Sequence, residues 1–330
     1  MNRPLDVLHV CKWDWANTGY RFVKCMQMVG LNVIALKGIK HDYDYSDQIG
    51  VIPQLGGTVY YRHPITIMAP ELRPLAESAR VIHFHASTFV DMGIDLTQKK
   101  VVVQHGGSTY RKAPDDCDKV FNQFASVTIM QFPMYMVHNP NNPVLVYYPV
   151  DTDLIQPDFS RKGRLRIGHF PSTGSAKGTE DIEKVCCSLS RLPGYKDRFE
   201  YTVDKTNLPW SQHIDRMRQY DIIIETVKEV YHGQRFGEWG NTALEAAALG
   251  KVVVTNCHSS ELYRREYGDC ALQIANDRPQ LMDTLKRLIS MDDADIGRLA
   301  QETRQWVEEK HGMKPTADRL WMKVYQGLIS

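Results

Sequence analysis

The sequence has no long apolar run and no regular cysteine spacing, and each absence excludes a class of protein. No stretch reaches the roughly eighteen apolar residues of a membrane-spanning helix, and the N-terminal segment lacks the apolar run of a signal peptide. The seven cysteines are odd in number and include no Cys-x-x-Cys pair, which argues against a disulfide framework and a structural zinc site. We therefore expect a soluble, cytoplasmic protein that does not insert stably into membranes.

The chain also lacks an excess of charge of either sign. Its 40 lysines and arginines nearly balance its 39 aspartates and glutamates. No overall positive field therefore attracts nucleic acid or anionic membranes. The 330 residues fit two domains of roughly 150 residues each, and two domains imply a cleft.

Short runs rich in β-branched residues recur in both halves and predict buried parallel strands. Helical patterns separate them, the first over residues 20–29 after the turn Asn17-Thr18-Gly19. Strands that alternate with helices predict an α/β fold with one parallel sheet in each half. Residues 41–63 show no clear period and are assigned to loops. The predicted strands span residues 7–10, 31–36, 79–85 and 100–105, then 165–170, 199–203, 220–224 and 251–255.

A proline-rich segment, residues 139–157, lies between the halves and is the predicted linker. The predicted N-terminal domain spans 1–150 and the C-terminal domain 151–313. Residues 314–330 form a final amphipathic helix that is expected to pack back toward the N-terminal domain. Parallel sheets bind ligands at the carboxyl ends of their strands, so residues that directly follow strands are the candidates for function.

Residues 235–251 are the most informative stretch. A glycine-bearing loop runs into a helix that begins at Asn241 or Thr242 and is closed by Gly250. The free N–H groups and the positive dipole end of such a helix favour a phosphate. Glu245 lies about one turn inside, on a helix otherwise built of Ala and Leu, and the hydroxyls of a ribose would satisfy its buried carboxylate. The alternative is an ordinary capped helix whose glutamate forms a salt bridge.

Several motifs in this order resemble the retaining family-4 type of GT-B glycosyltransferases, which have two Rossmann-like domains whose parallel sheets face each other across a cleft. The resemblance covers most of residues 100–290 and is thinner before them. The motifs are His105-Gly106, VDTDLIQP at 150–157, Lys177-Gly178-Thr179, YDIII at 220–224 and EAAALGKVVV at 245–254.

The resemblance implies a role for each matched position. Glu245 would hold the ribose of the donor nucleotide, and Lys177 would neutralise the departing diphosphate. His105 would line the donor sugar from the first domain. Each has a simpler alternative. Glu245 would form a salt bridge, Lys177 would be an exposed lysine of a loop, and His105 would form hydrogen bonds with backbone groups. The implied catalytic residues are His105, Lys177 and Glu238, and the implied donor-binding residues are Gly19, Gly106, Ser172, Arg235, Gly240, Asn241, Thr242 and Glu245.

Two positions depart from the family pattern. The first glutamate of the signature is expected eight residues before Glu245, where Gly237 stands, and Glu238 is one position away. Either the turn is rearranged so that Glu238 takes the role of this first glutamate, or the contacts with the donor sugar differ from those usual in the family. The family's arginine shortly before the lysine is also absent, and Arg235 is the candidate substitute.

The resemblance implies transfer of a sugar from a UDP- or GDP-sugar to an acceptor, with retention of configuration and without a metal or other cofactor. The acceptor class is open: a glycan, lipid, protein, small metabolite or modified nucleic acid. A nucleotide-sugar epimerase and a catalytically silent GT-B module that binds a glycan or protein are the alternative functions.

Three further features were weighed. His83 and His85 are predicted to point to opposite faces of their strand and so not to share a metal. Trp13 and Trp15 follow the first strand, where they either stack on an acceptor sugar or simply pack. Arg111 either reaches a phosphate or is solvated.

Overall fold

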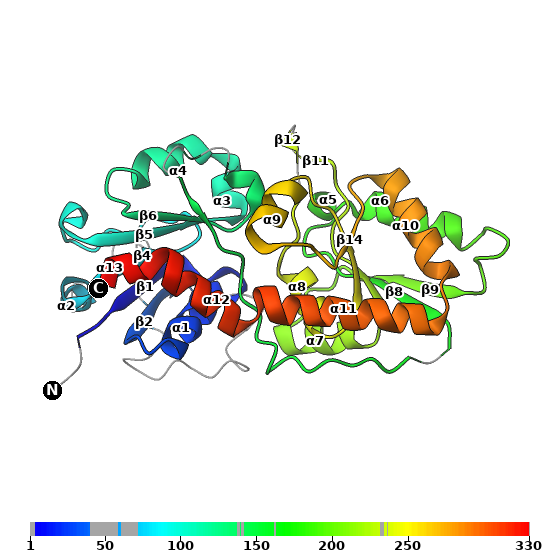
Figure 1. The fold of residues 1–330 in the computed structure, drawn as a ribbon. Helices are drawn as coiled ribbons and strands as arrows, with labels where there is room; N and C mark the ends of the chain where they lie inside the picture. Colours follow the sequence, from blue (N-terminus) through cyan, green and yellow to red (C-terminus); the bar gives the residue numbers. More distant parts are fainter. Residues whose placement is uncertain are drawn as a thin grey trace. The chain divides into compact units, whose positions relative to one another are not determined.

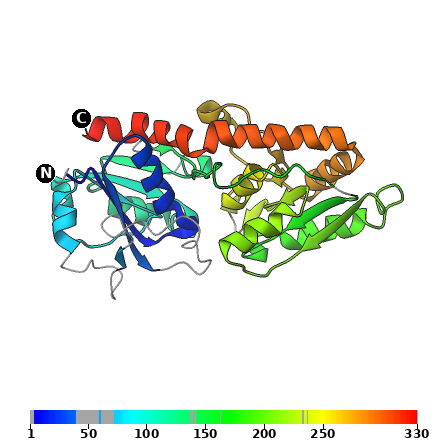
Figure 2. The same ribbon diagram turned by 90° about the horizontal axis from the view of Figure 1, so that it is seen from below.

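The computed structural model describes residues 4–39, 59–60, 72–136, 139, 142–161, 163–231, 234–235 and 237–329. The chain forms two compact units, shown in Figures 1 and 2. Unit 1 comprises Met1–Pro149 and Met313–Ser330, and unit 2 comprises Val150–Gly312. Each unit contains a parallel sheet with helices, which confirms the predicted fold class. None of the described helices is both long and apolar enough to cross a membrane.

Unit 1 is built on a seven-stranded sheet in the order β3-β2-β1-β4-β5-β6-β7, and every neighbouring pair is parallel. Val7 and His9 of the central strand β1 lie opposite Val81 and His83 of β4. The central strands are buried on both faces, as expected of a parallel sheet. The strands are β1 (Val7–Trp13), β2 (Val33–Ile39), β3 (Val59–Tyr60), β4 (Val81–Phe84), β5 (Lys100–His105), β6 (Val127–Met130) and β7 (Val144–Leu145).

Helices cover both faces of this sheet. Phe22 of α1 packs with Leu320 and Tyr325 of the C-terminal segment on one face, and Figure 1 shows that segment beside α1. Phe121 of α4 packs on the other face. The elements are η1 (Trp15–Asn17), α1 (Thr18–Met28), α2 (Arg73–Ser78), η4 (Leu96–Gln98), α3 (Gly107–Lys112), α4 (Pro114–Phe121), η5 (Pro133–Tyr135), α12 (Met313–Leu320), the π-helical η6 (Trp321–Tyr325) and α13 (Gln326–Ile329).

The segment predicted as the linker is divided between the two units: residues 139–149 belong to unit 1 and residues 150–157 to unit 2. Strand β7 pairs with β6, and Val146, Tyr147 and Tyr148 beyond it are buried. The prolines suggested a free connection, but the apolar residues between them dock onto the sheet. The predicted loop over 41–63 lies outside the described residues, apart from β3.

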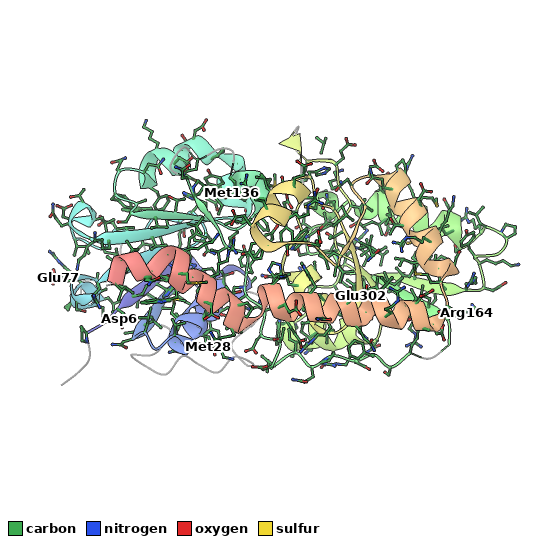
Figure 3. The ribbon with its side chains drawn as sticks, viewed as in Figure 1. Asp6, Met28, Glu77, Met136, Arg164 and Glu302 are labelled. Carbon is green, nitrogen blue, oxygen red and sulfur yellow. The ribbon has the colours of Figure 1, made fainter. Side chains whose placement is uncertain are left out.

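Unit 2 contains a five-stranded parallel sheet in the order β14-β13-β10-β8-β9 and a separate hairpin of β11 and β12. On α11, Ile296 and Val307 are buried, whereas Glu302 is exposed (Figure 3). The strands are β8 (Leu165–His169), β9 (Phe199–Val203), β10 (Ile222–Ile224), β11 (Val230–Tyr231), β12 (Gln234–Arg235), β13 (Val252–Thr255) and β14 (Gln273–Ile274). The helices are α5 (Gly174–Lys177), α6 (Thr179–Leu189), α7 (Trp210–Arg218), α8 (Asn241–Ala248), α9 (Ser260–Tyr267), α10 (Arg278–Ser290) and α11 (Asp293–His311).

Candidate functional site

The candidate site of unit 2 lies where the order of its strands reverses. The chain runs from β8 outward to β9, then returns to the other side of β8 to form β10, β13 and β14. In open parallel sheets, ligands bind beyond the carboxyl ends of the two strands at such a switch point. Lys177 follows β8, Glu225 directly follows β10, and Thr255 ends β13. The three side chains meet there.

Glu225 is the centre of this group. Its side chain is 1% exposed, and one carboxylate oxygen, Oε1, forms an ion pair with the Lys177 ammonium group. The other oxygen, Oε2, accepts a 2.9 Å hydrogen bond from Thr255 Oγ1. The Gly240 N–H, immediately before α8, also donates to Oε1 at 3.4 Å. A buried negative charge is thus balanced by one cation and two neutral donors.

The turn that carries Lys177 is fixed by its backbone. Gly178 has a φ of +72°, and a Cβ atom there would lie 1.9 Å from the carbonyl oxygen of Val227. The Val227 N–H donates to the Lys177 carbonyl at 3.2 Å. Only glycine fits this conformation and this close approach. The lysine therefore sits on a rigid turn, and its side chain is still 24% exposed.

Helix α8 begins beside Glu225. Gly240 is its N-cap residue, and the Gly240 N–H donates to Glu225 Oε1 at 3.4 Å. The first-turn N–H groups, at Asn241 and Thr242, have no partner within the helix itself. Trp239, just before the cap, is buried edge-on against Tyr263 with ring centroids 4.7 Å apart. The loop into α8 is anchored, and its N–H groups form a fixed positive end.

Glu245 lies one turn along α8 and is 3% exposed. Its Oε1 accepts a 2.7 Å hydrogen bond from the indole Nε1 of Trp210, the first residue of α7. The sequence predicts a ribose as the partner of this carboxylate, and Trp210 carries no local signal that would have identified it. The contact with a ribose stays a prediction.

Glu238 occupies a different environment. Its Oε2 accepts a hydrogen bond from Cys257 Sγ at 3.1 Å, and hydrogen bonding to Ser259 also favours its charged form. Burial raises the pKa of this carboxyl to about 7. A group that is half protonated near neutral pH has the pKa of a general acid or base. Its predicted catalytic role is untested.

Two other predicted donor-binding residues have few described contacts. Ser172 lies after β8 and is exposed. Arg235 ends β12, and its side chain lies outside the described part of the structure. His169, which sequence analysis did not single out, ends β8, and its two ring nitrogens bond to the Ile224 carbonyl (2.8 Å) and Thr179 Oγ1 (2.9 Å). Burial lowers its pKa to about 4, so it is a neutral structural link.

In unit 1, His105 ends β5 and is fully buried. Its Nδ1 is 3.0 Å from Ser87 Oγ, its Nε2 is 3.5 Å from Asp118 Oδ1, and its ring stacks on Tyr110. Burial lowers its pKa to about 3, so the imidazole is neutral despite the nearby carboxylate. The predicted contact with a donor sugar stays a prediction.

Gly106 follows His105 and packs against a side chain. A Cβ atom at this position would lie 1.7 Å from Gln131 Oε1. The Gly106 N–H is also 3.4 Å from Ser87 Oγ. The absence of a side chain at Gly106 is thus required by packing within unit 1, whatever else this residue does.

Gly19 lies at the start of α1, where the carboxylate of Asp14 already accepts from the N–H group that could otherwise bind an anion. Asp14 Oδ1 accepts a 2.7 Å hydrogen bond from the Gly19 N–H, and Oδ2 pairs with Lys37. Lys37 also donates to Asn17 Oδ1 at 2.7 Å. A Cβ at Gly19 would lie 2.3 Å from Cys11 Sγ. These contacts favour the packing explanation for Gly19.

The prediction that His83 and His85 face opposite ways is wrong. Side chains two residues apart in a strand share a face. The two rings stack with centroids 4.1 Å apart, and His9 Nδ1 lies 2.8 Å from His85 Nε2. All three imidazoles are buried on the face covered by α1 and the C-terminal segment. One ring nitrogen from each of the three imidazoles lies within 4.8 Å of the others, so this buried cluster has the spacing of a metal-ligand set.

The remaining candidates of unit 1 surround the ends of β1 and β5. Trp13 ends β1 and Trp15 begins η1, but their side chains lie outside the described part of the structure. Arg111 lies in the last turn of α3 and is half-buried. The stacking and phosphate-binding roles weighed for these residues stay predictions.

Comparison with known proteins places this geometry in a known fold. No protein-family model and no curated protein sequence matches the chain. Solved structures do. The chain has the GT-B fold. HepE of Anabaena, in complex with UDP and glucose, is 11% identical, with a TM-score of 0.65 over 98% of this chain and 100% of that one.

Two further structures with this fold were found. Sucrose-phosphate synthase from Thermosynechococcus elongatus is 13% identical, with a TM-score of 0.63 over 98% of this chain and 99% of that one. S. aureus MnaA, in a structure with UDP, is also 13% identical, with a TM-score of 0.56 over 99% and 98%. At such low identity the likeness shows the fold alone.

Proposed function

We propose that the chain is a glycosyltransferase whose unit 2 binds a nucleotide-diphosphate sugar and whose unit 1 receives the acceptor. One observation carries the proposal: Lys177 and the start of α8 meet at the switch point of the unit 2 sheet. Together they supply a cation and a helix dipole for a diphosphate. Glu245, one turn further along α8, is the proposed partner of the ribose.

The chemistry follows from where charge develops. Breaking the bond between the sugar and the diphosphate leaves negative charge on the departing phosphate, which a fixed lysine and N–H groups stabilise. No metal is needed for this, and we propose that none is used. The family resemblance favours retention of configuration. HepE is described with UDP and with UDP-glucose, so UDP-sugars are the first donors to test.

The decisive experiment is calorimetric titration of the full chain with UDP, GDP and ADP in the presence of EDTA. We expect one nucleotide to bind in roughly the micromolar range. Lys177→Met and Glu245→Ala should each weaken that binding about tenfold or more, which corresponds to roughly 1.4 kcal/mol. Lys184→Met and Glu302→Ala remove the same charges from exposed positions and should leave affinity unchanged.

The alternatives predict different results. A chain that binds no nucleotide would be a silent GT-B module. If incubation with a UDP-sugar and no acceptor converts the sugar to its isomer, the chain is an epimerase. Transfer to an acceptor with inversion, detected by NMR of the product, would contradict the proposed stereochemistry.

A further inference from the structure

The site of unit 2 contains a carboxylate where the proposed function requires a phosphate. Glu225 Oε1 accepts from both Lys177 Nζ and the Gly240 N–H. These are the groups that would bind a diphosphate. One acceptor position cannot be shared by a carboxylate and a phosphate, because both are anions and would repel each other at contact distance.

We infer that Glu225 binds to the same groups that would bind the phosphates of the donor, namely Lys177 Nζ and the Gly240 N–H. The diphosphate must therefore displace Glu225 when the donor binds. The inference rests on the proposed function and adds to it a control on donor affinity. Only ligands that bind strongly enough to replace the glutamate are retained, so single phosphates and other weak anions are rejected.

The geometry shows how firmly Glu225 is held. Its Oε2 is fixed by Thr255 Oγ1 at 2.9 Å, so one end of the carboxylate is anchored to β13. The bond from Gly240 to Oε1 is longer, at 3.4 Å, and is the weaker of the two hydrogen bonds. Displacement therefore needs a change only at Oε1. Lys177, 24% exposed, is the accessible partner to which a ligand would bind.

Two buried polar atoms belong to residues next in sequence to members of this group. Thr226 Oγ1 and Asn241 Oδ1, each adjacent in sequence to a residue of the group, are buried and have no hydrogen-bond partner among the described residues. Thr226 is 1% exposed. Buried polar atoms without partners are uncommon and are a sign of an absent ligand or water.

The test compares nucleotide affinity in two charge-matched variants. Glu225→Gln keeps the shape and the acceptor for Thr255 but removes the negative charge. Glu229→Gln removes the same charge from an exposed residue four positions away. Calorimetry with UDP and with inorganic pyrophosphate, in EDTA, should show binding at least tenfold tighter for Glu225→Gln than for the wild type. Glu229→Gln should bind like the wild type.

A nucleotide affinity of Glu225→Gln that is lower than that of the wild type, or equal to it, would overturn the inference. If Glu225 only positions Lys177 for the ligand, Glu225→Gln will bind UDP more weakly than the wild type or equally well. UDP binding to the wild type in that case leaves the proposed function intact. If neither protein binds UDP or pyrophosphate, the proposed function fails and Glu225 has no phosphate to exclude.

A second measurement covers the case in which Glu225→Gln does not fold. A crystal structure of the wild-type chain with UDP should show a phosphate oxygen on Lys177 Nζ and the Glu225 carboxylate turned away from Gly240 N. Retention of both Glu225 contacts beside bound UDP would refute displacement directly.

Discussion

Removing the charge of Glu238 should change the pH dependence of stability in a defined direction. Burial raises the pKa of this carboxyl from its ordinary 4.5 to about 7. The folded chain therefore keeps its proton over a pH range in which the unfolded chain has lost it. This contribution to stability is complete below about pH 4.5 and is lost as the pH rises to about 7.

The size of the effect follows from the same two values. The difference between 4.5 and about 7, at about 1.4 kcal/mol per tenfold change, gives roughly 3 kcal/mol. Glu238→Gln keeps an acceptor for Cys257 Sγ and cannot ionise. The variant should match the wild type to within about 1 kcal/mol at pH 4.5 and be about 3 kcal/mol more stable at pH 8.

The assay is urea denaturation of both proteins at steps between pH 4.5 and 8, with the difference in unfolding free energy plotted against pH. Buried histidines titrate equally in both chains, so they cancel in this difference. Glu229→Gln, at an exposed position, should give a flat line near zero. A flat line for Glu238→Gln as well would refute the account, because it would mean that the carboxyl does not titrate in this range.

Two further predictions concern the supports of the site. Gly178→Ala should destabilise unit 2 by about 2 kcal/mol or more and weaken UDP binding, because it combines a positive φ with a Cβ 1.9 Å from Val227 O. The control is Gly194→Ala, where φ is +88° with nothing within 4 Å; equal unfolding temperatures for the two variants would contradict the steric argument. Trp210→Phe keeps a ring but removes the donor to Glu245, so thermal unfolding should report a loss of about 1–3 kcal/mol. No loss in Trp210→Phe would mean that water or another group satisfies the carboxylate equally well.

Much of the fold could be predicted because buried parallel strands are short runs rich in β-branched apolar residues, which are easy to identify in a sequence. The runs at residues 100–105 and 199–203 coincide with β5 and β9. Strand β6 (Val127–Met130) was missed: it has only four residues, and Thr128 interrupts its apolar run. Strand β7 was missed for another reason: it lies among prolines, and only its docking onto β6 makes it a strand.

Only the parts of the site that have a signal in consecutive residues could be predicted from the sequence. A glycine loop followed by a helix is a local signal, and it located α8. Glu225 carries no such signal. It is one glutamate after a strand, and its importance comes from Lys177 and Thr255, which lie 48 and 30 positions away in the chain. The prediction for His83 and His85 was wrong because residues two apart in a strand lie on the same face of the sheet.

The starts of α1 and α8 show how similar arrangements of charged groups can differ in geometry. Each places a carboxylate at a helix start and pairs it with a lysine. In unit 1, Asp14 belongs to the loop that enters α1 and bonds to the Gly19 N–H at 2.7 Å, and Lys37 is held by Asn17 as well. In unit 2, Glu225 comes from a different strand and reaches Gly240 at 3.4 Å.

These distances imply different responses to an anion. Replacing Asp14 would break a short bond and leave a lysine side chain, only 11% exposed, without its carboxylate. Replacing Glu225 at Gly240 would break a long bond, and the more exposed Lys177 would exchange one anion for another. A buried cation stripped of its partner costs several kcal/mol, whereas an exchanged partner costs far less. We therefore expect the unit 1 pair to remain in place as a helix cap, and we propose that a diphosphate opens the unit 2 pair.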